Sequence, residues 1–279
     1  MKKISAAFDG LKFSSGTMEY AIQVAADSQA LLSGIFLDDF TYHSYKLYDM
    51  VGSQGVSKEK MKELMDKDKE TRLKSAASFQ SACTKANINY VVHHDKSIAE
   101  QELLRESIYS DMLLIGANET FTHFAEEPPT QFIKDLLADV QCPVMVVPLE
   151  YKEPQKVIML YDGKPSSVFA LKMFNYMMPW MRKIETDVIS VIDPKDNSEL
   201  SDSKLIREFV KCHYPDAKYT LLHGDPGEEI VQYLKSVQQN LLIVLGAYRR
   251  SAVSMWFKTS MADILMKEIS MPLFIAHNK

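Results

Sequence analysis

The chain has 279 residues, of which 46% are hydrophobic and 25% charged, and its formal net charge is −5. This balance is typical of a soluble globular protein, and the negative charge argues against nucleic acid or an anionic membrane as a partner. No apolar stretch approaches the length of a membrane span, and we expect no secretory signal. The three cysteines, Cys83, Cys142 and Cys212, form no C-x-x-C pair, so we expect reduced, mostly buried thiols in a cytoplasmic protein.

In the first half of the chain, short apolar runs alternate with amphipathic stretches. Continuous apolar runs of this length are typical of strands that are buried on both faces, as in a parallel sheet. The expected strands cover residues 4–8, 31–37, 90–93, 112–115 and 144–147. Between them lie stretches with helical spacing, such as Met18, Ala21, Ile22 and Ala25. Strands that alternate with helices predict parallel βαβ units with right-handed crossovers.

A longer excursion, from about residue 38 to residue 85, interrupts this alternation after the second strand. It begins with an aromatic, polar loop over residues 40–48 and continues into a heavily charged stretch over residues 58–72. Two interpretations stay open. The excursion is a lid or an arm that docks a partner, or it is a solvated helix whose opposite charges alternate at helical spacing.

The second half repeats the order of the first. Its expected strands cover residues 157–161, 187–192, 219–222, 241–245 and 273–276. In both halves the first strand closes in Asp-Gly, the fourth closes in Gly-Ala, and a proline precedes the fifth. Such self-similarity predicts two domains, one over residues 1–150 with the insertion 38–85 and one over residues 151–279. The join lies near Glu150, in a short polar segment bracketed by Pro148 and Pro154.

These repeated features resemble the universal stress protein family. The resemblance rests on the Asp-Gly strand ends (Asp9-Gly10 and Asp162-Gly163), on the run His223-Gly-Asp-Pro-Gly-Glu-Glu-Ile230, and on the prolines before the last strands. It covers essentially the whole chain. It implies two doubly wound α/β domains in tandem, each with a parallel five-stranded sheet of the adenine nucleotide α-hydrolase-like type. It also implies that the two domains pair through their last strands, within one chain.

Many members of that family bind ATP through the motif G-x2-G-x9-G-[ST] after the fourth strand. Glycines let the backbone approach phosphates, and the following helix N-terminus offers free N–H donors. The second half matches the first glycine with Gly246 and the final hydroxyl with Ser260, but Arg249 and Thr259 replace the two inner glycines. Arg249, Arg250 and Lys258 supply charge-assisted contacts to phosphate in place of the backbone cradle, or Ser260 simply caps a helix together with Asp263.

The resemblance implies a role for each matching residue of the second half. Asp162 lies beside the adenosine, and Val191 and Leu245 line the base pocket. Gly246 turns the chain under the phosphates, and Ser260 donates a hydrogen bond to them. An alternative for Asp162, and for its counterpart Asp9, is a strand-end residue that hydrogen-bonds its own turn.

The first half departs further from the ATP motif. The segment that begins Gly116-Ala-Asn-Glu119 continues through Glu126-Glu127-Pro128-Pro129. Proline removes an N–H donor, and the two adjacent glutamates, Glu126 and Glu127, repel a triphosphate. We therefore expect the first half to be a structural or interaction partner of the second rather than an ATP site.

Other kinds of chemistry find little support in the sequence. There is no G-x-S-x-G elbow and no G-x-x-x-x-G-K-[ST] loop. His93 and His94 are adjacent on a strand and point to opposite faces, so they converge poorly on one metal ion. No glycine- and serine-rich loop follows the first strand, as an ATP-cleaving adenylating enzyme needs.

We therefore predict a cytoplasmic stress-response regulator rather than a metabolic enzyme. It binds ATP or a related nucleotide in the second domain without rapid turnover, and slow hydrolysis stays open. The alternative is a nucleotide-free scaffold of the same fold. Its protein partner, and whether it forms a homodimer, are not given by the sequence.

Overall fold

The computed structural model describes residues 1–37, 51–52, 55–56, 58–95, 98–192, 203–247 and 260–278. The predicted aromatic loop and Arg249 lie outside these residues. The described strands are β1 (Lys3–Asp9), β2 (Leu31–Leu37), β3 (Val51–Gly52), β4 (Gly55–Val56), β5 (Tyr90–Asp95), β6 (Met112–Gly116), β7 (Val144–Val147), β8 (Lys156–Leu160), β9 (Glu185–Ile192), β10 (Lys218–His223), β11 (Leu241–Gly246) and β12 (Leu273–Ala276). The described helices are α1 (Ser15–Ser28), α2 (Lys58–Lys85), α3 (Ala99–Ile108), α4 (Gln131–Asp139), α5 (Pro165–Met177), α6 (Ser203–His213), α7 (Pro226–Ser236) and α8 (Met261–Glu268), with a 3-10 turn, η2, at Pro179–Lys183.

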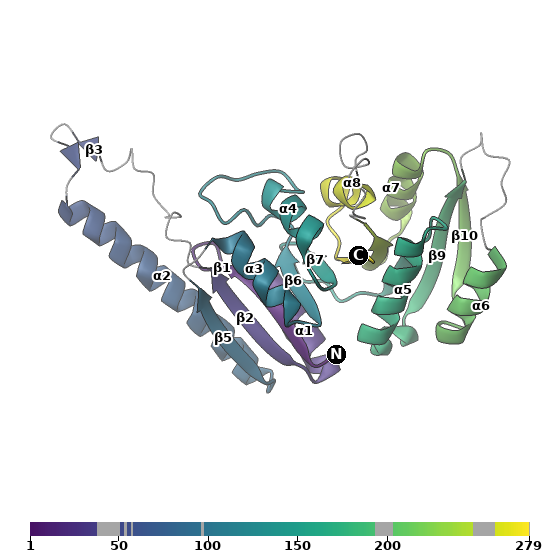
Figure 1. The fold of residues 1–279 in the computed structure, drawn as a ribbon, viewed down its shortest axis with the longest axis horizontal. Coiled ribbons are helices and arrows are strands. Elements are labelled where there is room, and N and C mark those ends of the chain that lie inside the picture. The colour runs from purple at the N-terminus through teal and green to yellow at the C-terminus, as the bar shows by residue number, and fades with distance from the viewer. Residues whose placement is uncertain are drawn as a thin grey trace.

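Ten strands form one continuous sheet in the order β10-β9-β8-β11-β12-β7-β6-β1-β2-β5 (Figure 1). All ten strands predicted from the apolar runs are confirmed. Neighbouring strands are parallel within each half, and the halves meet where β7 and β12 pair antiparallel, with Met145 opposite Phe274. This is the pairing of last strands that the resemblance implies. The predicted boundary near Glu150 stays a prediction, because the sheet runs through the junction without a break.

The strand order fixes where each half can hold a ligand. It reverses between β1 and β6 in the first half and between β8 and β11 in the second. In open α/β sheets, ligands bind beyond the carboxyl ends of the strands at such a reversal.

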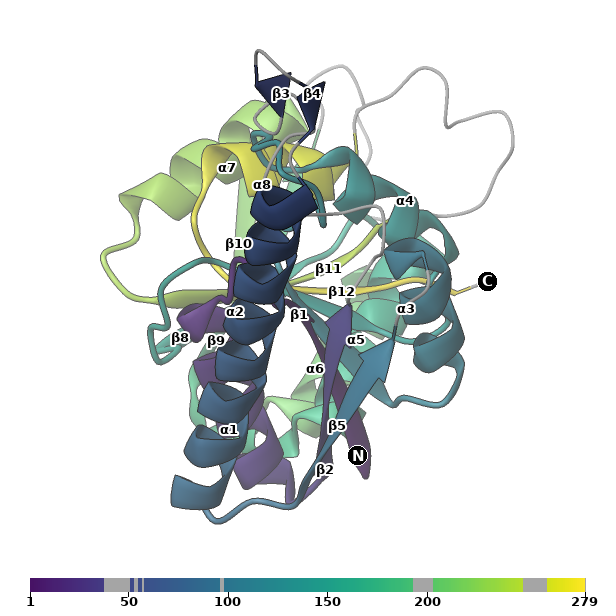
Figure 2. The ribbon, with the colours of Figure 1, turned by 90° about the vertical axis from the view of Figure 1, so that its left-hand side faces the viewer.

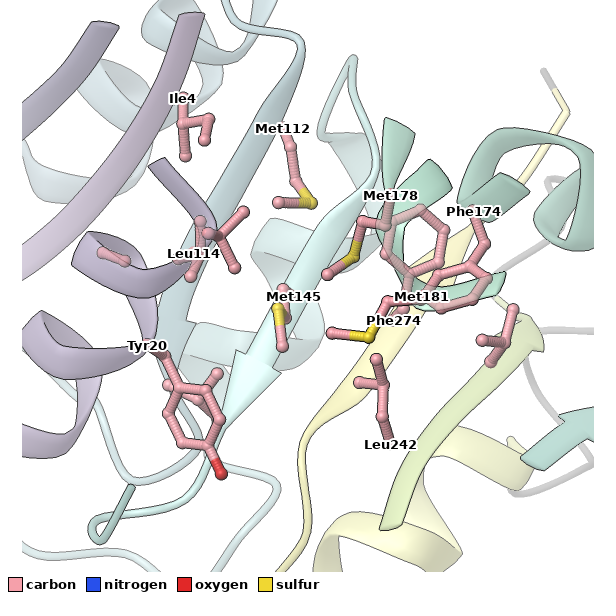
Figure 3. Close-up of a cluster of buried hydrophobic side chains, with 14 of the residues drawn as sticks. Ile4, Tyr20, Met112, Leu114, Met145, Phe174, Met178, Met181, Leu242 and Phe274 are labelled. Carbon is pink, nitrogen blue, oxygen red and sulfur yellow. The ribbon is translucent and has the colours of Figure 1, made fainter. Parts of the chain in front are cut away.

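Two apolar cores cover the two faces of the sheet, and each continues across the junction. Side chains of α1, α2, α5 and α6 pack on one face, and side chains of α3, α4, α7 and α8 pack on the other (Figure 2). Methionines fill the seam under β7 and β12. Figure 3 shows Met145 between Met112 of the first half and Met178 and Met181 of the second. Unbranched, polarizable methionines suit an irregular gap of this kind.

The segment between β7 and β8 is held against both halves. At Gly16 of α1 an added Cβ would overlap the carbonyl of Leu149, so only glycine lets the helix and the segment approach this closely. The hydroxyl of Tyr20 donates to the Lys152 carbonyl and accepts from the Lys152 N–H, both at 3.2 Å. On the other side, the Asn240 N–H donates to Oε1 of Gln155 at 3.2 Å. The segment is therefore a fixed connection.

The predicted charged helix is confirmed as α2, which has 28 residues. Its carboxyl-terminal part is anchored by Phe79, whose ring lies where a side chain on Gly34 would otherwise stand. Its amino-terminal part reaches beyond the sheet toward the β3–β4 hairpin (Figure 1). Glu70 and Lys74 form an ion pair of 2.6 Å at helical spacing. This exposed pair fits the solvated-helix interpretation, while a docking role stays a prediction.

The cysteines follow the expectation at two positions of three. Cys83 and Cys142 are buried, and burial raises the pKa of Cys83 to about 11. Cys212 is exposed, which corrects the expectation for that residue, because it stands on the outer side of α6. Among the described helices, none is long and apolar enough to cross a membrane.

A buried acid ties the outer strands of the second half to α7. Asp187 is 2% exposed and accepts hydrogen bonds from the hydroxyls of Tyr233 at 2.6 Å and Thr220 at 3.0 Å. The ammonium of Lys156 lies 3.8 Å away. Burial and the Asp187 hydrogen bond together raise the pKa of Tyr233 to about 12. The hydroxyl therefore stays a donor to the carboxylate throughout the physiological range.

Tyr233→Phe is expected to lower the free energy of unfolding by about 1.5 kcal/mol, because it removes one donor from a buried carboxylate. Chemical denaturation at neutral pH measures the change. Tyr109→Phe is the matched control, since Tyr109 is 72% exposed, and it should leave the midpoint unchanged. Equal midpoints for Tyr233→Phe and the wild type would show that the hydrogen bond contributes no net stability.

Candidate functional site

The predicted residues of the second half gather where its strand order reverses. Asp162 follows β8, Val191 lies near the end of β9, and Leu245 and Gly246 close β11. These three strands are direct neighbours in the order β9-β8-β11. Leu245 is buried in the same core as the α8 side chains, and α8 begins directly after Ser260. The fold therefore brings the four strand residues to one edge of the sheet and places the start of α8 on the same face as Leu245.

Asp162 combines an exposed carboxylate with a fixed position. Its Oδ1 accepts a hydrogen bond from the Lys164 N–H at 3.0 Å, and its Oδ2 lies 3.2 Å from the Lys164 ammonium. Its side chain is nonetheless 52% exposed. Partial burial raises the pKa of Asp162, but hydrogen bonds from Ser167 and Lys164 outweigh it, so the net pKa is lowered. The group is an ionised acceptor at neutral pH, and the predicted turn chemistry is present.

Gly246 is required by packing. A Cβ at this position would overlap the carbonyl of Ser166 and lie 2.7 Å from the N of Ser167. The first turn of α5 therefore passes directly over the end of β11. In the ATP motif a glycine lets a phosphate approach the backbone closely. At Gly246 the backbone of α5 makes this close approach instead.

Ser260 is the N-cap of α8, as one interpretation of the sequence expects. Its Oγ accepts a hydrogen bond from the Ala262 N–H at 3.3 Å. A side chain that accepts one early N–H leaves other N–H groups of the first turn to an anion. Arg249 is outside the described residues, so its predicted contact with phosphate stays a prediction.

The equivalent edge of the first half is closed by its own carboxyl groups. Asp9, the counterpart of Asp162, is 1% exposed and accepts from the Leu11 N–H at 2.8 Å. Glu119 is 8% exposed and folds over Gly116, where an added Cβ would lie 3.4 Å from its Cγ. The hydroxyl of Thr130 donates to the Glu119 carbonyl at 2.6 Å. The side chain of Glu119 therefore stands at the reversal point of this half.

Burial, together with repulsion from Asp9, raises the pKa of Glu119 to about 8, although Lys12 opposes the shift. The group is therefore largely protonated at neutral pH. A second carboxylate, that of Glu126, accepts from the Gln131 N–H at 2.8 Å and so occupies one of the free donors at the start of α4. The sequence pointed to Glu126 and Glu127 as repulsive charges. It did not indicate Glu119, although this residue replaces the second glycine of the motif.

The loop that carries Glu119 also forms part of a cavity wall, with Ala117, Asn118 and Pro128 lining it. The volume of this cavity is about 600 Å³, and it opens at the junction of the halves, beside Leu149, Met271 and Pro272.

The two histidines of β5 are separated as predicted. His93 hydrogen-bonds Glu106 of α3 at 2.7 Å, whereas the His94 ring lies 5.7 Å from the Phe36 ring on the opposite face. Within the described residues no three potential ligands cluster around a metal position.

No protein-family model matches the chain, and no curated protein matches its sequence. Solved structures do match. A universal stress protein from Archaeoglobus fulgidus DSM 4304 superposes with a TM-score of 0.72 over 99% of this chain and 98% of its own, at 15% identity. The chain has the universal stress protein fold. A functionally unknown protein from Pseudomonas aeruginosa PAO1 also matches, with a TM-score of 0.62 over 99% of this chain and 92% of its own, at 10% identity.

The match covers both halves of this chain rather than one of them. The two points of strand-order reversal differ in the exposure of their carboxyl groups. The second half exposes Asp162, whereas the first half buries both Asp9 and Glu119. The asymmetry directs the search for a ligand to the second half.

Proposed function

We propose that the chain is a regulatory protein that binds an adenine nucleotide, with ATP as the expected form, in its second half and without rapid turnover. The observation that carries this proposal is the exposed, ionised Asp162 at the reversal point between β8 and β11. A carboxylate accepts hydrogen bonds from the hydroxyl groups of a ribose. Val191 is only partly buried and offers apolar surface to a base, and the buried Leu245 backs this surface from the core.

The phosphates would lie toward the amino terminus of α8. Ser260 caps this helix, and the positive end of its dipole favours an anion. The side chains of Arg249, Arg250 and Lys258 would supply charge in place of the missing glycines. No recognisable nucleophile–base pair accompanies these residues, which fits binding without rapid turnover.

The protein offers a matched pair of variants that separates binding from helix capping. Ser260 and Thr130 are the N-caps of α8 and α4, the equivalent helices of the two halves. Calorimetric titration of ATP into the full chain should give micromolar binding. We expect Ser260→Ala to weaken it about tenfold, which is about 1.4 kcal/mol, and Thr130→Ala to leave it unchanged.

Arg249→Ala provides an independent check, since it removes charge without touching a helix cap. It should weaken ATP more than adenosine, because only ATP presents phosphates to the guanidinium. The proposal fails if no heat is detected at millimolar ATP. It also fails if Ser260→Ala and Thr130→Ala change the affinity equally, since binding would then not distinguish the halves.

A second function, that of a nucleotide-free scaffold, is supported by one specific observation. Gly246 is accounted for by the passage of α5 over β11, and Asp162 by its own turn, without any ligand. In this function the chain acts through its surface, including the protruding part of α2. Absence of nucleotide binding in the titration, with the fold intact, would favour it.

A further inference from the structure

We propose that the second half carries a separate pocket for a small amphipathic acid, that is, an apolar or aromatic molecule with one anionic group and one hydrogen-bond donor. The pocket has a volume of about 540 Å³ and lies between α5 and α6, beside the turn that follows β8. Its volume falls within the usual range for small-molecule sites, about 300–1,000 Å³.

The walls of this pocket are mainly apolar. Val168 and Phe169 of α5 face Leu205, Ile206 and Phe209 of α6 across it. Helix α6 buries only Ile206 and Val210 fully, so its other apolar side chains are available at the pocket. Leu205 is 61% exposed, which is unusual for a large side chain beside a cavity. Covering these surfaces favours a ligand with an apolar body.

One cation at the pocket determines the sign of the charge that the ligand should carry. Lys172 of α5 lines the cavity and forms no ion pair with the described residues. Two neighbouring cations are already engaged: Lys164 pairs with Asp162 at 3.2 Å, and Arg207 lies 4.6 Å from the centre of the Tyr219 ring. The ammonium of Lys172 is thus the charge that the pocket presents to a carboxylate or sulfonate.

One polar group at the pocket needs a donor. Asn278 lines the cavity, and its Oδ1 is buried without a hydrogen bond from any residue in the described part of the chain. Buried polar atoms are nearly always paired, so an orphaned acceptor at a cavity is informative. An N–H or O–H of the ligand would satisfy it, which adds the donor to the ligand's description.

This pocket is distinct from the proposed nucleotide site. Leu245 belongs to the core on the α7 and α8 face of the sheet, and Val191 packs against that core. The pocket lies on the α5 and α6 face, and the two sites meet at the turn that carries Asp162, where Tyr161, Gly163 and Pro165 line the pocket. The inference therefore does not rest on nucleotide binding, and either can fail without the other.

The test uses two fluorescent probes that differ by one group. The probe 8-anilinonaphthalene-1-sulfonate has an aromatic body, an N–H and a sulfonate, and N-phenyl-1-naphthylamine lacks only the sulfonate. Fluorescence titration into the full chain should show saturable binding of the anionic probe. We expect Lys172→Gln to weaken that probe about fivefold and to change the neutral probe less than twofold. Lys183→Gln, an exposed lysine of η2 outside the pocket, should change neither.

Leu205→Gln locates the site, because this exposed position tolerates a polar side chain without loss of the fold. It should weaken both probes, and thermal unfolding checks that each variant stays folded. The proposal is overturned if the anionic probe does not bind. It is also overturned if Lys172→Gln weakens both probes equally, or if Leu205→Gln changes neither.

Discussion

Gly246→Ala is expected to lower the free energy of unfolding by about 3 kcal/mol, at the upper end of the range for overpacking a core. The reason is that the new Cβ would meet backbone atoms. It would overlap the carbonyl of Ser166 and lie 2.7 Å from the N of Ser167, and neither can rotate away as a side chain would. The first turn of α5 would have to move off the end of β11. Urea denaturation at neutral pH gives the change as a shift in midpoint.

Gly116→Ala is the matched control, because Gly116 closes β6 at the equivalent position of the first half. There an added Cβ would lie 3.1 Å from Oγ1 of Thr17 and 3.4 Å from Cγ of Glu119, both of them side-chain atoms. We expect this variant to lose less than half as much stability as Gly246→Ala. Equal losses would mean that the two helices approach their strands alike and that the proposed tight contact at Ser166 is not special.

The fold could be predicted from the sequence because the central strands are buried on both faces, whereas the outer strand β10 is exposed or half-buried along its length. A strand such as β11 (Leu241–Gly246) then appears as an uninterrupted apolar run, and the proline before β12 marks where the next begins. The repeat of these signals gave the same order in both halves. The short β3–β4 hairpin was not predicted, because two residues per strand leave no periodic pattern.

The candidate site could be predicted only in part. The adjacency of Asp162, Val191 and Leu245 followed from strand order, which the resemblance supplied. The difference in exposure between Asp162 and Asp9 did not, because it depends on which side chain lies above each residue. The role of Gly246 in packing was equally hidden, since its contact comes from Ser166, 80 positions earlier in the chain.

The pH dependence of stability should reveal the buried acid of the first half. The pKa of Glu119 is raised from an ordinary value of 4.5 to about 8 by burial and by Asp9. Between these values the folded chain holds a proton that the unfolded chain has released. The contribution of Glu119 to stability must therefore fall as the pH rises from about 4.5 and stop falling above about 8. At pH 7 the penalty relative to a neutral side chain is about 3 kcal/mol.

Glu119→Gln removes this titration while it keeps the size of the side chain. Urea denaturation repeated between pH 5 and pH 8 measures the effect. The free energy of unfolding of the variant should rise relative to that of the wild type by about 1.4 kcal/mol for each pH unit. Comparing the two proteins cancels the titration of every group that does not interact with Glu119. Glu127 is an exposed carboxylate of the same loop, so Glu127→Gln should show the same pH dependence of stability as the wild type. If Glu119→Gln also shows the wild-type pH dependence, the Glu119 carboxyl group is ionised in the folded chain. The first half then exposes its reversal point to solvent as the second half does.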